Sequence, residues 1–176
     1  MRQPVTYISL KRFMDALANA TAAATRVYLV GGATAVLLGW RDATIDIDLK
    51  IVPENDELLR SLPRLKESLQ LNLELAAPDD FIPELPGWQE RSRFIEQIGR
   101  VTFLHYDFYA QAMAKIERGH VTDLRDVDEM IRAGLVEPIR LLEFFTVIEP
   151  QLYRYPAVDT PSFRRAVERV VASSEQ

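Results

Sequence analysis

The segment from Val27 to Val52, VYLVGGATAVLLGWRDATIDIDLKIV, constrains the fold of this chain more than any other. Its first residues, Val27–Val30, form a short apolar run rich in β-formers, which predicts a buried strand. Gly31 and Gly32 interrupt the run, and the apolar stretch Ala33–Trp40 predicts a short buried helix directly after them. A strand, a glycine pair and a short helix therefore follow one another here.

A second strand is predicted over Thr44–Val52, and it carries Asp46 and Asp48. Alternate residues of a strand share a face, so the two carboxylates point the same way, about 7 Å apart, while Ile47 points to the opposite face. Two like charges at this spacing repel each other, which makes physical sense if a hard cation lies between them. Mg²⁺ fits such a site, because it prefers oxygen ligands and shares them with substrate phosphates. An ordinary solvent-facing strand is the alternative.

The glycine pair has two interpretations. Without side chains, Gly31 and Gly32 would let a triphosphate approach the backbone closely, and the N–H groups at the start of the following helix would face it. The pair could equally be only a tight turn.

The remaining pattern changes character after about residue 107. Further strands are predicted over Leu71–Leu75 and Arg100–Tyr106, whereas Arg93–Ile98 is ambiguous. Helices are predicted over the following segments: Ser9–Ala23, Asn55 or Asp56 to Leu69 with a kink or early end at Pro63, Tyr109–Arg118, Asp123–Ala133, Pro138–Ile148 and Pro161–Ala172. A proline-stiffened loop is expected over Pro78–Gly87. We therefore expect an α+β fold, a small mixed β-sheet with flanking helices and a helical C-terminal extension, divided into a core over residues 1–120 and an extension over residues 121–176 packed on it.

Composition narrows the chemistry. The chain has no cysteine, which excludes disulfides, zinc–thiolate sites and a cysteine nucleophile, and its only histidines are His105 and His120. The net charge of −5 argues against a protein that coats nucleic acid through bulk charge. No apolar run has the roughly 18 residues of a membrane span, and the N-terminus lacks the core of a signal peptide. We expect a cytoplasmic protein without a membrane partner.

The succession of Gly31-Gly32, a short helix and Asp46-Ile47-Asp48 resembles the polymerase-β-type nucleotidyltransferase superfamily. Within it, the chain looks similar to small bacterial nucleotidyltransferase-like proteins related to toxin–antitoxin and abortive-infection transferases. A lysine-bearing helix followed by a basic–acidic turn recurs in these relatives after the sheet, and here Ala114–His120 and Asp123–Val127 match it. The resemblance covers roughly residues 25 to 130.

The resemblance implies a Mg²⁺-dependent enzyme, with two ions, that moves a nucleoside monophosphate from an NTP to an acceptor hydroxyl. The acceptor could be an RNA end, a protein side chain or a small molecule, and a toxin or antitoxin partner is possible. Catalysis and metal binding would fall to Asp46, Asp48 and Glu74. Lys115 would offset phosphate charge, and the remaining nucleotide contacts would come from Gly31, Gly32, Thr34 and Asp123.

Several of these assignments depart from the usual pattern or have a plainer explanation. The third carboxylate is usually Asp, so Glu74 competes with Asp79 and Asp80, and it could also be a surface residue. A serine after the glycines is missing, and Thr34 would have to replace it. Lys115 could simply lie along an apolar surface, and Asp123 could be a helix N-cap.

These departures keep a second hypothesis open: a catalytically impaired nucleotidyltransferase fold that serves as a binding or antitoxin-like module. A dinucleotide-binding Rossmann unit fits worse. The glycines lack the G-x-G-x-x-G pattern, and Asp46 follows Gly31 by only 15 residues where about 20 are expected.

Overall fold

The computed structural model describes residues 1–176, and these form two compact units. The first contains residues 1–77 and 92–106, and the second contains residues 78–91 and 107–176. The boundary therefore falls before helix α5 (Phe108–Arg118), not at residue 120 as the sequence suggested. The reason is that α5 packs against α6 (Val121–Arg132), α7 (Pro138–Ile148) and α8 (Thr160–Ser174).

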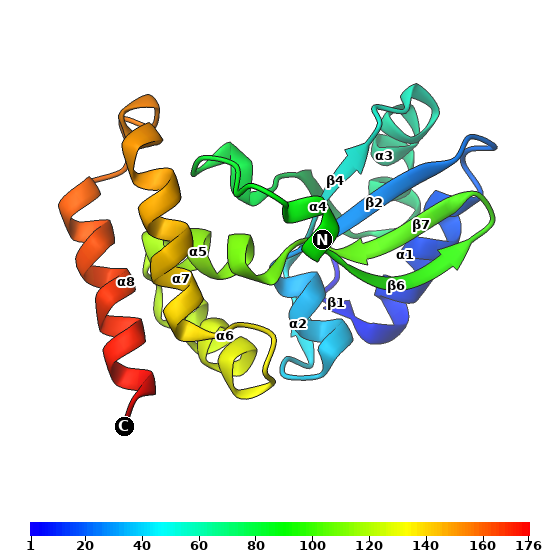
Figure 1. The fold of residues 1–176 in the computed structure, drawn as a ribbon. Helices are drawn as coiled ribbons and strands as arrows, with labels where there is room; N and C mark the ends of the chain where they lie inside the picture. Colours follow the sequence, from blue (N-terminus) through cyan, green and yellow to red (C-terminus); the bar gives the residue numbers. More distant parts are fainter. The chain divides into compact units, whose positions relative to one another are not determined.

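The first unit is built on a five-stranded mixed sheet in the order β5-β4-β2-β7-β6 (Figure 1). Strand β2 runs antiparallel to β4 and parallel to β7, β4 runs parallel to β5, and β6 runs antiparallel to β7. The strand bounds are β2 Thr25–Val30, β4 Asp46–Val52, β5 Asn72–Leu75, β6 Arg93–Ile98 and β7 Val101–His105. The expected small mixed sheet is confirmed, and the ambiguous segment at Arg93 is its edge strand.

A separate two-stranded ribbon pairs β1 (Val5–Thr6) with β3 (Ala43–Thr44), and this pairing was not predicted. Helix α1 (Tyr7–Ala18) begins directly after β1 and ends five residues earlier than the pattern suggested. Thr6 caps α1, because its hydroxyl accepts a hydrogen bond from the Ser9 backbone N–H.

One face of the sheet is packed against helices. Helices α1 and α3 (Asp56–Leu69) contact each other there, and α2 (Gly32–Leu38) contacts β2 and β4. The core contains apolar residues from these three helices and from alternate strand positions, among them Leu10, Phe13, Leu17, Val27, Leu29, Val36, Ile47, Leu49, Leu58, Leu62, Val101 and Phe103. The opposite face therefore presents the other strand positions, including both aspartates of β4.

Helix α3 shows how local sequence sets an element's ends. Its N-cap is Asn55, whose side-chain oxygen accepts a hydrogen bond from the Leu58 backbone N–H, as predicted. The early end considered at Pro63 is wrong, because one helix continues through it to Leu69. An amphipathic apolar face, with Leu58, Leu62 and Leu65 buried, outweighs the proline here.

The second unit is helical throughout. Its N-terminal piece contains two short helices: η1 (Pro78–Asp80), which lies within the loop predicted over Pro78–Gly87, and α4 (Trp88–Arg91), which follows that loop. Its C-terminal piece contains α5 to α8 and a 3₁₀ segment, η2 (Glu149–Arg154), so the helical C-terminus is confirmed. Inside this unit Arg91 pairs with the buried Asp107, and Phe145 meets Phe163 edge to face. No helix combines the length and the apolar character that a membrane crossing requires.

Candidate functional site

The two aspartates of β4 lie on one face of the strand. Asp46 and Asp48 are half-buried, whereas Ile47 and Leu49 between and after them are buried in the core. The observed alternation of burial matches the strand period of two. The sheet therefore presents both carboxylates on the face opposite the core cluster.

Gly31 lies directly against this carboxylate pair. It follows the last residue of β2, Val30, which is the register partner of Asp48. Its φ is +65°, a conformation that a side chain would disfavour, and a Cβ placed there would lie 3.4 Å from Asp48 Oδ2. A bare backbone position thus adjoins the Asp48 carboxylate.

Gly32 has a different reason to be glycine. It is the first residue of α2, and a Cβ on it would overlap the Thr44 side chain of β3. The glycine is needed because α2 begins in close contact with β3. This contact could not be foreseen from the sequence, since the two-residue strand carries no periodic pattern.

Thr34 is fully buried in α2. Its hydroxyl lies 3.0 Å from His105 Nδ1 and 3.4 Å from the Leu29 carbonyl oxygen, to which it donates. Burial, reinforced by the positive charge of Arg93, lowers the pKa of His105 from 6.5 to about 4. The Thr34 hydroxyl therefore makes polar contacts inside the first unit, and the structure does not favour the expected contact with phosphate.

Glu74 is brought next to the aspartates by the register of β5. Parallel pairing places Asn72 opposite Asp46 and Glu74 opposite Asp48. The Asn72 amide donates to Asp46 Oδ1 and lies 3.4 Å from Glu74 Oε1, so it connects the two strands' acidic side chains. No motif in the sequence singles out Asn72 as a site residue. The alternatives Asp79 and Asp80 belong to η1 of the second unit.

The oxygen donors of β4 suit a hard divalent cation such as Mg²⁺, which commonly takes one or two carboxylates and completes its shell with water and substrate phosphates. No group of three or more histidine, aspartate or glutamate side chains in residues 1–176 is arranged to hold a metal ion. Asp46 and Asp48 fit the ion as a pair, and Glu74 stands beside them without completing a three-carboxylate cage.

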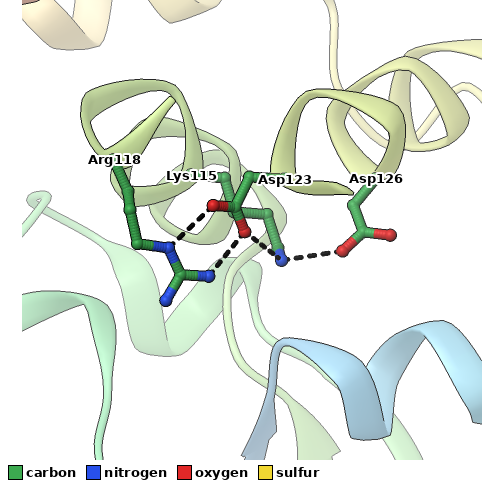
Figure 2. Close-up of polar contacts among 4 residues, drawn as sticks. All are labelled: Lys115, Arg118, Asp123 and Asp126. Atoms are coloured by element: carbon green, nitrogen blue, oxygen red, sulfur yellow. Dashed lines mark hydrogen bonds and ion pairs between the residues drawn. The ribbon is translucent and has the colours of Figure 1, made fainter. Parts of the chain in front are cut away.

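Lys115 and Asp123 belong to a second polar cluster, within the second unit (Figure 2). Lys115 Nζ donates to Asp126 Oδ2 at 2.8 Å and lies 3.5 Å from Asp123 Oδ1. Arg118 holds the same Asp123 in a fork, with Nε 2.7 Å from Oδ2 and Nη2 2.5 Å from Oδ1. Two positive and two negative charges thus neutralise one another.

Helix geometry builds this cluster. Helix α5 ends at Gly119, whose φ is +72°, and α6 begins at Val121, so Asp123 lies in the first turn of α6 and is not its N-cap. Lys115 and Arg118 are three residues apart on α5, and Asp123 and Asp126 are three apart on α6, so each pair shares a helix face. The two faces meet where the helices pack together.

Three of the four charged side chains in this cluster are buried. The side chains of Lys115, Asp123 and Asp126 are 8%, 3% and 2% exposed. Burial alone would raise the pKa of Asp123, but the hydrogen bond from Arg118 and the charges of Lys115 and Arg118 together outweigh it and lower that pKa. The structure gives the Lys115 ammonium two carboxylate partners of its own, an arrangement that favours a packing role over the expected role at a phosphate.

Comparison with solved structures identifies a protein of the same architecture. The crystal structure of an antigenic nucleotidyltransferase-like protein from Paracoccidioides brasiliensis superposes with a TM-score of 0.52 over 94% of this chain and 95% of that one, at 18% sequence identity. The chain has a nucleotidyltransferase-like fold. At this identity the similarity establishes the fold alone, which agrees with the α+β expectation. No family model and no curated protein sequence matches the chain.

Proposed function

We propose that this nucleotidyltransferase-like fold is a metal-dependent enzyme that transfers a nucleoside monophosphate from an NTP to an acceptor hydroxyl. The observation that carries the proposal is the placement of Asp46 and Asp48 on one half-exposed sheet face, with the Gly31 backbone against Asp48. A pair of hard oxygen ligands beside a backbone without a side chain suits a cation-bound polyphosphate.

In this proposal Asp46 and Asp48 hold Mg²⁺. When bound, the ion offsets the charge of the triphosphate and polarises the phosphorus–oxygen bonds. Asn72 keeps Asp46 in position through its amide, and the absence of a side chain at Gly31 leaves room for the phosphates. Glu74, the register neighbour of Asp48, orients the acceptor hydroxyl or takes its proton.

The experiment incubates the protein with labelled NTPs, Mg²⁺ and candidate RNA or protein acceptors. We expect the wild-type protein to label an acceptor and Asp46→Asn/Asp48→Asn to lose at least about 100-fold of that activity. The control, Asp42→Asn/Glu54→Gln, removes two exposed acidic charges from the same unit and should retain activity. Equal labelling by wild type and the Asp46/Asp48 variant would refute the mechanism.

A second candidate is a catalytically impaired nucleotidyltransferase fold that serves as a binding or antitoxin-like module and does not bind NTPs. It is favoured by the lack of a three-carboxylate group and by the Asn72 amide on Asp46. Calorimetry with ATP, GTP and CTP separates the two. Mg²⁺-dependent nucleotide binding that requires Asp46 and Asp48 supports the enzyme, whereas no binding at millimolar nucleotide supports the module.

A further inference from the structure

A depression lies in the first unit, at the opposite ends of the strands from the aspartates. It has a volume of about 390 Å³, and its lining combines polar and apolar residues: Ala24, Thr25, Arg26, Val52, Pro53, Gln97, Arg100 and Thr102. Arg26 and Val52 are register partners, and they lie four residues along their strands from Val30 and Asp48. At the strand rise this is roughly 13 Å from Asp48, and Asp46 lies farther still.

The sheet register explains why these residues meet. Arg26 of β2 has Val52 of β4 on one side and Thr102 of β7 on the other, and Thr102 in turn faces Gln97 of β6. Their neighbours Val27, Ile51, Val101 and Phe103 are core residues, so this row lies on the sheet face opposite that core.

A tight turn brings the second arginine to the row. Gly99 and Arg100 form the two-residue connection between β6 and β7, with φ +58° at Gly99. The Thr25 backbone N–H donates to the Arg100 carbonyl oxygen at 3.1 Å, which ties the turn to the start of β2. Asn55 holds Thr25 in turn, because its amide donates to the Thr25 hydroxyl at 2.8 Å. These hydrogen bonds hold the turn and the start of β2 in fixed positions beside the depression.

The charge of the depression is not balanced. Arg26 and Arg100 are exposed, and neither side chain forms an ion pair or a hydrogen bond within the protein. No aspartate or glutamate lines the depression, while Thr102 and Gln97 add a hydroxyl and an amide. Two guanidinium groups with free donors suit a dianion, and arginine is the preferred partner of phosphate. The volume is within the range of small-ligand sites, and Ala24, Val52 and Pro53 offer apolar contact to the rest of a ligand.

We propose that this depression binds a small phosphate monoester, such as a nucleoside monophosphate, through Arg26 and Arg100. The site is separate from the carboxylate pair, so it needs no metal ion and does not depend on the proposed transfer activity.

The test is calorimetric titration of the whole protein with AMP, inorganic phosphate, acetate and a single-stranded RNA, in EDTA to remove divalent cations. We expect AMP to bind, inorganic phosphate to compete with it, and acetate to have no effect. Arg26→Gln/Arg100→Gln should weaken AMP binding at least tenfold. The matched control Arg60→Gln/Arg64→Gln removes two exposed charges from α3 and should bind as wild type does. Asp46→Asn/Asp48→Asn should also bind normally, which separates this site from the proposed active site.

The proposal is overturned if AMP does not bind at about 5 mM, close to the weakest affinity that would matter. It is equally overturned if Arg26→Gln/Arg100→Gln and the control Arg60→Gln/Arg64→Gln weaken AMP binding to the same extent. It is also overturned if only single-stranded RNA, and no small phosphate, binds in an Arg26- and Arg100-dependent manner. Circular dichroism of each variant shows whether it is folded, and a variant that has lost structure is replaced by the corresponding single substitution.

Discussion

At the scale of single residues, the buried His105 makes the stability of the protein depend on pH. Its folded-state pKa of about 4 lies below the ordinary 6.5, because burial and the charge of Arg93 disfavour the protonated ring. The unfolded chain therefore binds the proton more readily. The stability that the neutral ring contributes is present above pH 6.5 and is lost as the pH falls toward 4.

We accordingly expect the free energy of unfolding to fall by about 2 kcal/mol between pH 7 and pH 5 through this residue. Urea unfolding at several pH values measures it. His105→Asn should remove most of that slope, whereas His120→Asn should keep it, since His120 is exposed ahead of α6. If both variants keep the wild-type slope, His105 is not the group responsible.

Asp126 is the nearest partner of the buried Lys115 ammonium. Asp126→Asn leaves the more distant Asp123 as the only negatively charged partner of that ammonium, so we expect a loss of about 3 kcal/mol of stability. Asp128→Asn, on an exposed position of the same helix, should change stability by no more than about 0.5 kcal/mol. Chemical denaturation compares the two, and similar small losses would mean that the cluster contributes little.

The sequence predicted the face shared by Asp46 and Asp48 because a strand's period of two is a local property. The sequence could not predict the surroundings of Thr34, because its partner His105 is 71 residues away and is brought next to it only by strand pairing. Lys115 illustrates the same limit. Its motif was visible, but the burial that surrounds it with carboxylates depends on how two helices pack.

At the scale of elements, α3 carries Pro63 in its interior, where a proline cannot donate to the carbonyl of Leu59. Because Pro63 is exposed, Pro63→Ala should raise stability by about 1 to 3 kcal/mol. The control is Pro161→Ala, in the first turn of α8, where no helical hydrogen bond is lost and little gain is expected. A Pro63→Ala protein no more stable than wild type, judged by its urea midpoint, would contradict this.

The elements that the sequence predicted well have local signals at their ends. Asn55 caps α3, and Gly119 ends α5 in the left-handed conformation. The ribbon of β1 and β3 was missed because two residues are too few to show a period. Strand β6 was ambiguous because a shift in its pairing with β7 between Phe94 and Glu96 disturbs the alternation.

At the scale of the whole molecule, the proposed nucleotide site should make stability depend on ligand. A ligand that binds only the folded state at 100 times its Kd adds about 2.7 kcal/mol. For a chain of this length, Mg²⁺ with the preferred NTP should then raise Tm by about 5 to 10 °C. A thermal melt measures the shift. EDTA or Asp46→Asn/Asp48→Asn should abolish it, and a shift that survives both would place the nucleotide elsewhere.

The division into two units could not be predicted from the sequence, although the change from mixed to helical pattern near residue 107 was visible. Residues 78–91 belong with the C-terminal helices because their packing partners lie there: Arg91 pairs with Asp107, and the Tyr155 hydroxyl reaches the Asp79 carbonyl oxygen. Such a discontinuous unit has no marker in local composition.

The discontinuity has a consequence for synthesis on the ribosome. The chain passes between the units after residues 77, 91 and 106, and β7, a neighbour of β2 in the sheet, is made only after residues 78–91. The sheet cannot close until this early portion of the helical unit has emerged without its partners. A nascent chain of which only the first 100 residues have left the ribosome would therefore expose both the unpaired edge of β2 and a helical segment without its packing partners, which are features that chaperones recognise.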